Sequence, residues 1–216
     1  MQPARPMMDI QSKARRVGII GGSFDPVHMG HLVIAQDAAE KLELSEVVFI
    51  PAAIPPHKQH LQQVDSCHRL NMLQLAIEAD IRFSVSDIEI RRGGVSFTID
   101  TVRALKDERP DVEWVLLIGS DTLVDLHNWY KIDELLGLCE VSTFLRPGES
   151  SLDGIGEKIL LPDRHKARLM ENVIEAHLIG ISSTEIRMRI AEGLGIRYLV
   201  PPEVEMYIYE HGLYQG

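Results

Sequence analysis

The chain alternates short apolar runs with helical patterns, and this alternation limits the folds that it can adopt. Val17–Ile20 is a continuous apolar run that meets a Gly-Gly pair, and Val47–Ile50 is a second run that ends at Pro51. The segment between them has apolar side chains at helical spacing, at Leu32, Ala35, Ala39 and Leu42. Such a strand–helix–strand unit predicts two parallel strands joined by a right-handed crossover.

The same alternation continues toward the C-terminus. We expect further strands over residues 82–90, 114–118, 140–145 and 177–181. Helices are expected over residues 69–79, 98–109 and 183–192, and again from residue 201. Strands that alternate with helices predict an α/β fold, with a doubly wound, mostly parallel sheet, helices on both faces and a C-terminal helical portion.

The length of 216 residues suits one large domain. We expect a mobile extension over residues 1–15, a single domain over residues 16–216, and a mobile insertion over residues 148–156. No apolar run is long enough to span a bilayer, and the N-terminal residues lack the apolar core of a secretory signal. The sequence therefore predicts no membrane segment and a cytoplasmic location.

Charge and cysteine usage narrow the partners. There are 22 Lys and Arg residues against 32 Asp and Glu, giving a formal net charge of −10. An acidic chain repels a phosphate backbone, which argues against broad nucleic-acid binding, whereas small phosphorylated ligands need only a few local cations and helix N-termini. Cys67 and Cys139 match no metal-binding spacing, so we expect two buried free thiols.

The most informative segment is Gly21–His31, with the sequence GGSFDPVHMGH. It lies where the first expected strand meets the first expected helix, at the carboxyl end of the sheet, where such folds bind ligands. Gly21 and Gly22 let backbone amides approach a phosphate, and the helix N-terminus adds unpaired N–H groups and a partial positive charge. His28 and His31 are three residues apart and can reach one anion together.

Other readings of this segment agree less well with its residues. A dinucleotide fingerprint needs three glycines at another spacing, and a P-loop needs a Lys and a Ser or Thr after its glycines. Two His side chains could ligate zinc, but no third ligand of suitable spacing is near in the sequence. The alternative that the two His side chains only cap and pack a turn stays open.

Two motifs resemble a known superfamily. The run Gly-Gly-Ser-Phe-Asp-Pro, followed by His-x-Gly-His from His28, resembles the signature of the nucleotidyltransferases, which is shared with class I aminoacyl-tRNA synthetases. The run Ile181–Arg187 is similar to the Ser-Ser/Thr-x-x-Ile-Arg motif of the adenylyltransferases. On physical grounds alone, Ser182 and Glu185 fit a capping box, and Arg187 lies one turn farther on, near an anion at the helix N-terminus. A plain capped helix with a solvated Arg is the alternative.

Further segments resemble the bacterial nicotinate-mononucleotide adenylyltransferases. They are residues 51–58, 96–98 and 118–130, together with Arg146-Pro147 after an expected strand. The resemblance runs from Val17 to Tyr214 and implies a Rossmann-like fold. It departs only in the additional N-terminal residues and in the stretch after Pro147.

The resemblance also implies a reaction. The phosphate of nicotinate mononucleotide would attack the α-phosphorus of ATP in line, giving nicotinate adenine dinucleotide and pyrophosphate in NAD biosynthesis. Such a reaction needs positioning and charge stabilisation and no general base. Mg²⁺ would be bound with ATP, without a protein cage.

The implied site has catalytic and binding residues. The catalytic residues are His28, His31 and Arg187, with His31 nearest the α-phosphate. For ATP the resemblance implies contacts from both motifs and from two positions that lie between them in the sequence. The residues are Gly21, Gly22, Ser23, Phe24, His28, His31, Lys58, Asp121, Ser182, Ser183 and Arg187. For the mononucleotide it implies Ser23, His57, Phe97, Thr98, Trp129 and Arg146.

Several of these residues have a structural alternative. Trp129 could stack on the pyridine ring, or it could instead belong to the core. The carboxylate on the pyridine ring could accept a hydrogen bond from the amide of Thr98. Asp121 could accept from ribose hydroxyls or only cap the next helix. The three cations expected on phosphates could instead be solvated surface charges: His57, Lys58 and Arg146.

Rival functions differ in their acceptor or in turnover. One rival is another nucleotidyltransferase, which would act on pantetheine phosphate or glycerol phosphate. The paired segments at residues 96–98 and at Trp129 argue against this rival. A nucleotide sensor would bind without turnover, which the intact His-x-Gly-His disfavours. A tRNA synthetase needs a longer chain and a basic surface. Whether the chain forms a homo-oligomer, and how strongly it prefers the acid over the amide mononucleotide, is not set by the sequence.

Overall fold

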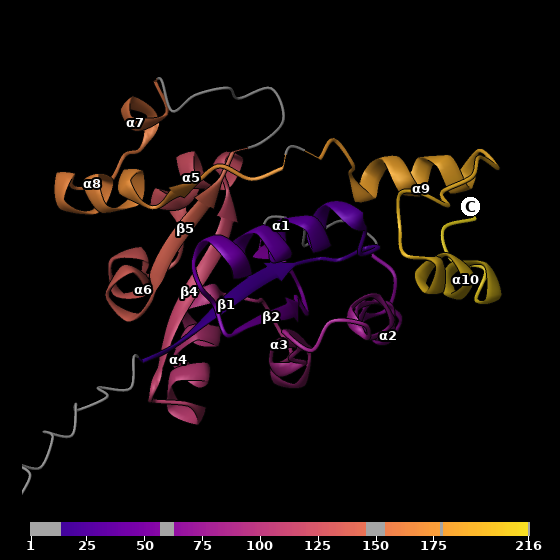
Figure 1. Cartoon of the computed structure of the whole chain (residues 1–216), viewed down its shortest axis with the longest axis horizontal. Helices are drawn as coiled ribbons and strands as arrows, with labels where there is room; N and C mark the ends of the chain where they lie inside the picture. Colours follow the sequence, from indigo (N-terminus) through magenta and orange to yellow (C-terminus); the bar gives the residue numbers. More distant parts are fainter. Residues whose placement is uncertain (1–13, 57–62, 146–153, 178, 216) are drawn as a thin grey trace, which may run out of the picture.

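A single parallel sheet organises the computed structural model, which describes residues 14–56, 63–145, 154–177 and 179–215. Its strand order is β3-β2-β1-β4-β5-β6, and every pairing of neighbours is parallel (Figure 1). The strands are β1 (Arg15–Gly22), β2 (Glu46–Pro51), β3 (Phe83–Val85), β4 (Val112–Gly119), β5 (Glu140–Phe144) and β6 (Val173–Ile174). The Rossmann-like α/β fold expected from the sequence is confirmed.

Helices cover both faces of the sheet. On one face lie α1 (Met29–Lys41), α2 (Ser66–Ile77), α9 (Ser183–Ala191) and α10 (Pro202–Glu210). Residues of the other core belong to α3 (Ile88–Arg92), α4 (Thr98–Glu108), α5 (Ser120–Asp125), α6 (Ile132–Leu138), α7 (Ile155–Lys158) and α8 (Asp163–Glu171). Figure 1 shows α10 beside α2, and α7 and α8 at the opposite end of the molecule from α9 and α10.

The strands are apolar on both sides because each side faces a core. In β4, Val115 and Leu117 belong to the core beneath α1, whereas Leu116 and Ile118 belong to the core beneath α4. Successive side chains of a strand point to opposite faces, so a strand between two helical layers needs a continuous apolar run.

The order of the strands places the topological switch point of the sheet at the carboxyl end of β1. The chain passes from β1 to β2 on one side, and β4 lies on the other side of β1. At this end, Gly21 and Gly22 pair with Ile50 and Pro51. Ligands of open α/β sheets bind at such a switch point, outside the carboxyl ends of the strands.

Two expected strands are wrong in extent or place. Of residues 82–90 only Phe83–Val85 form a strand, and α3 begins soon after, with the backbone N–H of Arg91 donating to the carbonyl of Asp87 at 2.8 Å. The described residues of 177–181 form no strand, and β6 instead comprises Val173–Ile174. His177 directs its backbone N–H to a side-chain carboxylate rather than to a neighbouring strand.

Smaller corrections concern boundaries and burial. β1 begins at Arg15, inside the expected N-terminal extension, whose residues 1–13 lie outside the described residues. Residues 148–153 of the expected insertion also lie outside them, whereas Ile155–Lys158 form α7. Cys139 is buried as expected, but Cys67 is exposed, because it lies in the first turn of α2. Across the described parts of the chain, we find no helix long and apolar enough to traverse a bilayer.

Candidate active site

The loop between β1 and α1 is held from beneath by a buried arginine. Arg69 on α2 is 2% exposed, and its guanidinium donates to the carbonyls of Ser23 at 2.7 Å, Ala52 at 2.8 Å and Val64 at 3.1 Å. Burial lowers the pKa of this guanidinium, and the neighbouring charge of Asp25 opposes that shift. Arg69 therefore ties the start of the loop to the segment after β2.

A second set of contacts holds the loop from the C-terminal helices. The side chain of Ser183 donates to the carbonyl of Pro26 at 2.8 Å, and the guanidinium of Arg187 donates to the carbonyl of Asp25 at 2.7 Å. These pairs are 157 and 162 residues apart in the sequence. The two motifs therefore form one corner of the molecule, and Arg187 is not simply a solvated cation.

The carboxylate of Asp25 is part of the same corner. Asp25 is 4% exposed, and the phenol of Tyr214 donates to its Oδ1 at 2.7 Å. Burial, and then the charge of Asp25, raise the pKa of the Tyr214 phenol, which therefore remains a hydrogen-bond donor.

The two motif histidines begin α1 and lie against each other. His28 is the N-cap residue and His31 the third helical residue, and their rings stack with centroids 3.7 Å apart. The backbone N–H of His28 donates to Nδ1 of His31 at 3.2 Å. Because Nδ1 accepts, a neutral His31 carries its proton on Nε2, where the ring can donate to an anion.

Gly30 and Phe24 position these rings. A Cβ on Gly30 would lie 3.1 Å from two atoms of the His28 ring, so any side chain there would displace His28. Phe24 has a positive φ of 47° and is 2% exposed, and its ring meets that of His31 edge-on at 5.0 Å. The side chain of Phe24 is thus a core support for His31.

The N-terminus of α9 lies at the same corner. Ser182 is the N-cap residue and its hydroxyl accepts from the backbone N–H of Glu185 at 3.1 Å, which confirms the Ser182 half of the expected capping box. Arg187 also donates to the hydroxyl of Thr184 at 3.2 Å. The helix start offers N–H groups and a partial positive charge, and Arg187 adds a cation one turn farther on.

A second group of expected residues lies near the ends of β2 and β4. The hydroxyl of Ser96 accepts from the backbone N–H of Ala53 at 2.9 Å, which joins the start of α4 to the segment after β2. The ring of Phe97 lies 4.8 Å from that of Tyr130, and Thr98 is the first residue of α4. Phe97, Thr98 and the Trp129-Tyr130 pair are thus brought together.

The structural alternatives for Trp129 and Asp121 have different outcomes. Trp129 is half-buried and packs against the core beneath α4, so it is a core residue on one side only. Asp121 is exposed in the first turn of α5, and the N-cap residue of that helix is Gly119. The alternative that Asp121 is the N-cap residue of the next helix is therefore wrong.

Comparison with known proteins assigns the chain. The model of the cytidylyltransferase-like family matches residues 19–189. The chain belongs to this family. Within it, a relative from Synechococcus sp. (strain JA-3-3Ab) is 42% identical over 202 residues, covering 93% of this chain and 95% of its own. A relative from Halalkalibacterium halodurans is also 42% identical over 202 residues, covering 93% and 92%. Both are named as probable nicotinate-nucleotide adenylyltransferases.

A solved structure agrees in fold. The nicotinic acid mononucleotide adenylyltransferase of Plasmodium falciparum, complexed with NaAD, superposes with a TM-score of 0.72 at 19% identity. The match covers 93% of this chain and 97% of that one. The cytidylyltransferase-like chain is therefore a nucleotidyltransferase with the Rossmann-like fold of that enzyme.

Three expected site residues of this nucleotidyltransferase cannot be placed, because His57, Lys58 and Arg146 lie outside the described residues. Two others were missed by the sequence reasoning. Arg69 shares a helical face with the buried Leu73, and a cation on an apolar face is a signal that could have revealed it. Tyr214 gives no such signal, because only the folded chain brings it to Asp25.

The described residues have little to offer a protein-bound metal. No group of three or more His, Cys, Asp and Glu side chains among them could hold a metal ion. The donors at the corner are histidines, hydroxyls, guanidinium groups and backbone N–H groups, which suit phosphate oxygens.

Proposed function

We propose that this nucleotidyltransferase transfers the adenylyl group of ATP to nicotinate mononucleotide, giving nicotinate adenine dinucleotide and pyrophosphate. The observation that carries the proposal is the corner at the carboxyl end of β1. There Ser183 and Arg187 of α9 bond to the loop that presents His28 and His31. The names of the relatives, which are 42% identical over most of the chain, support the choice of acceptor.

The ATP half of the site is assigned to the two motifs. His31 would donate from Nε2 to an α-phosphate oxygen, with His28 beside it. Ser182, Ser183 and Arg187 would hold the β- and γ-phosphates at the start of α9, with help from Lys58. The backbone of the strand end and loop would line the nucleotide through Gly21, Gly22, Ser23 and Phe24, and the exposed carboxylate of Asp121 would accept from ribose hydroxyls.

The mononucleotide half is assigned to the second group. The pyridine ring would stack on Trp129, which is open on the side away from the core. The backbone N–H of Thr98, at the first position of α4, would donate to the pyridine carboxylate, with Phe97 beside it. We assign Ser23, His57 and Arg146 to the mononucleotide phosphate.

The chemistry that follows is a displacement at phosphorus. An oxygen of the mononucleotide phosphate forms a bond to the α-phosphorus while the bond from that phosphorus to the bridging oxygen of pyrophosphate breaks. The nucleophile is ionised at neutral pH, so no side chain needs to remove a proton. His31 and Arg187 would stabilise the charge on the α-phosphate and on the departing pyrophosphate, and the fixed corner would align the reacting groups.

Mg²⁺ is proposed to enter with ATP. The phosphate-directed donors of the corner are compatible with an ion carried on the phosphates, and we assign no described side chain to it. When bound, the ion would neutralise part of the phosphate charge. We also propose that the enzyme acts in the cytoplasm.

An acceptor screen tests the proposal. Purified protein with Mg-ATP is given nicotinate mononucleotide, nicotinamide mononucleotide, pantetheine phosphate or glycerol phosphate, and pyrophosphate release is followed against a reaction without acceptor. We expect the fastest release with nicotinate mononucleotide. Equal rates with both mononucleotides would contradict recognition of the carboxylate by Thr98. Release only with another acceptor would contradict the mononucleotide half while leaving the ATP half standing.

A further inference from the structure

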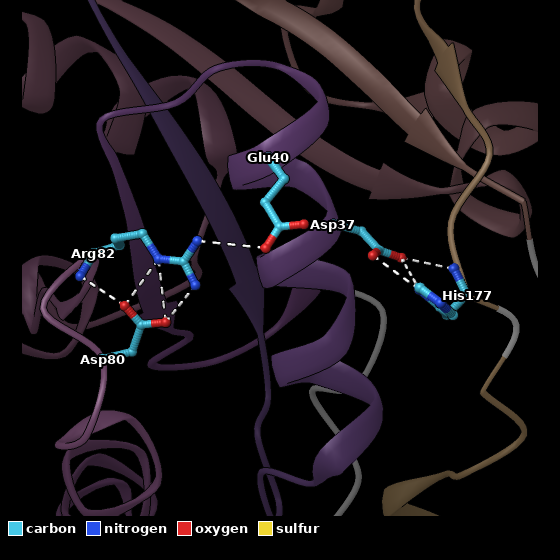
Figure 2. Close-up of polar contacts among 5 residues, drawn as sticks. All are labelled: Asp37, Glu40, Asp80, Arg82 and His177. Carbon is cyan, nitrogen blue, oxygen red and sulfur yellow. Dashed lines mark hydrogen bonds and ion pairs between the residues drawn. The ribbon is translucent and has the colours of Figure 1, made fainter.

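A buried carboxylate in the middle of α1 has no part in the corner described above. Asp37 is 4% exposed, and its carboxylate accepts from the backbone N–H of His177 at 2.7 Å and from the ring Nδ1 of the same residue at 2.9 Å (Figure 2). The His177 side chain itself is 74% exposed. A carboxylate is costly to bury without partners, so the position of Asp37 depends on these bonds.

His177 belongs to a segment that joins β6 to α9. We refer to residues 175–177 and 179–181 as the linking segment; none of them lies in a helix or strand. The ammonium group of Lys41, one turn after Asp37, donates to the carbonyl of Glu175. In the other direction along α1, a Cβ on Gly30 would lie 3.5 Å from a methyl carbon of Ile179. The linking segment therefore runs along α1, antiparallel to it.

The linking segment ends at the corner that the two motifs form. Beyond the linking segment the chain enters α9, where Ser183 and Arg187 bond to the loop in front of α1. Thus α1 carries His31 in its first turn and Asp37 less than two turns farther on, while the segment that Asp37 holds leads directly into α9. The separation between the histidines and the start of α9 depends on how the linking segment is attached to α1.

Ala176 and Ile181 of the linking segment pack against the core, and Asp37 supplies its buried polar attachment to α1. A segment without regular secondary structure has no ladder of backbone hydrogen bonds to fix it, and a charged acceptor makes a stronger bond to a backbone N–H than a neutral one. Lys41 is a second contact, but its partner is the carbonyl of Glu175, farther from α9. Of these contacts, only that of Asp37 combines a buried carboxylate with two donors on the same residue, His177.

We propose that Asp37 is a positioning residue for adenylyl transfer. By fixing the linking segment on α1, its carboxylate holds the start of α9 at the distance from His28 and His31 that the phosphates of ATP require. The proposal rests on the proposed function. It predicts that weakening this attachment impairs the ATP half of the site. The mononucleotide half, on α4 and the segment after α5, should be unaffected.

The same helix supplies a matched control. Glu40 is three residues after Asp37, and its carboxylate lies 3.6 Å from the guanidinium of Arg82, which is held by Asp80 (Figure 2). Both side chains of this pair are substantially exposed, at 55% for Glu40 and 38% for Arg82. Figure 2 shows Glu40 and Asp37 directed to different sides of α1, so Glu40→Gln removes an acidic charge from the helix without touching the linking segment.

The test compares Asp37→Asn with Glu40→Gln in steady-state kinetics with both substrates. We expect Asp37→Asn to lower kcat by about 10- to 100-fold, the scale of a misplacement of about 1 Å, and to raise KM for ATP. KM for the mononucleotide should stay within about twofold, as should every parameter of Glu40→Gln. Asp37→Glu, which keeps the charge, should recover part of kcat. Unchanged kcat and KM in Asp37→Asn together with a lowered melting temperature would reduce Asp37 to a structural role and overturn the proposal.

Two further measurements do not depend on the acceptor. Asp37→Asn should weaken ATP binding in calorimetry and speed hydrogen exchange of the amides over residues 175–187, neither of which Glu40→Gln should do. Faster exchange with unchanged ATP binding would overturn the proposal. If the wild-type protein fails to use nicotinate mononucleotide, the proposed function fails, but these two measurements still decide the role of Asp37.

A milder variant covers the case in which Asp37→Asn does not fold. His177→Ala removes the ring donor and keeps the backbone N–H bond, while Lys41→Met removes the second contact. We expect the double variant to fold and to raise KM for ATP without changing KM for the mononucleotide. A double variant with wild-type KM for ATP would overturn the proposal.

Discussion

The phenol oxygen of Tyr214 lies 2.7 Å from Oδ1 of Asp25, so the residues after α10 are fastened to the loop that presents the motif histidines. Asp25 is 4% exposed, its own backbone carbonyl accepts from Arg187, and the carbonyl of the following Pro26 accepts from Ser183. A phenol 189 residues away in the sequence thus helps to set the geometry of the loop that carries the first motif.

Tyr214→Phe should destabilise the protein and slow the reaction. The change removes a hydrogen bond to a buried charged group, which is worth about 1.5–3 kcal/mol. Urea denaturation should show a loss of this size in the free energy of unfolding, together with a lower kcat. Tyr209→Phe, at a residue that is 45% exposed on α10, serves as the control and should change neither. A Tyr214→Phe protein as stable as the wild type would show that the bond is not formed in solution.

His31→Ala should abolish most turnover while the fold survives. Removing one donor to a charge that develops in the transition state typically lowers kcat on the order of 10²–10³-fold. Circular dichroism should give a wild-type spectrum. His165→Ala removes an imidazole on α8, 3.3 Å from Asp133 and distant in the fold from the loop after β1, and should leave kcat unchanged. A folded His31→Ala protein with near-normal kcat would remove His31 from the mechanism.

Trp129→Ala should affect one substrate only. Its ring packs on the core on one side, and the proposed pyridine stack is on the other. We expect a raised KM for nicotinate mononucleotide, with KM for ATP unchanged, because aromatic contacts of this kind contribute about 0.5–1.5 kcal/mol. A change confined to KM for ATP would contradict this assignment and place Trp129 in the ATP half of the site.

The two cysteines should differ in reactivity. Burial raises the pKa of the Cys139 thiol to about 12, whereas Cys67 is exposed and its pKa is raised mainly by a hydrogen bond with Asp65. A disulfide reagent at about pH 8 should therefore label one thiol per native chain and two in denaturant. Since an unfolded cysteine ionises near pH ~8.5, Cys139 should lower the stability of the fold as the pH rises from there toward 12. Rapid native labelling of both thiols would contradict this.

Local signals in the sequence predicted most of the fold. The apolar runs predicted β1, β2, β4 and β5, since strands buried on both faces need continuous apolar residues. They failed where contacts outside the segment decide the structure. The alternation over residues 82–90 was interrupted by α3, and the run over residues 177–181 was attached to Asp37 rather than to a strand. The helices α3, α5, α6, α7 and α8 were not predicted.

The candidate site divides in the same way. His28, His31, Ser183 and Arg187 could be found because each lies in a recognisable motif around the start of a helix. Tyr214 and Asp37 could not be found in this way, because they meet the loop and the linking segment only in the folded chain. A sequence pattern reports neighbours along one element, and these residues depend on neighbours from others.

The most direct test of the central claim is the identity of the products formed from Mg-ATP and nicotinate mononucleotide. Attack at the α-phosphorus, directed by His31 and the start of α9, predicts one pyrophosphate and one nicotinate adenine dinucleotide for each ATP consumed, measurable by phosphorus NMR and mass spectrometry. Formation of ADP or inorganic phosphate in place of pyrophosphate, or consumption of ATP without any dinucleotide, would contradict the account.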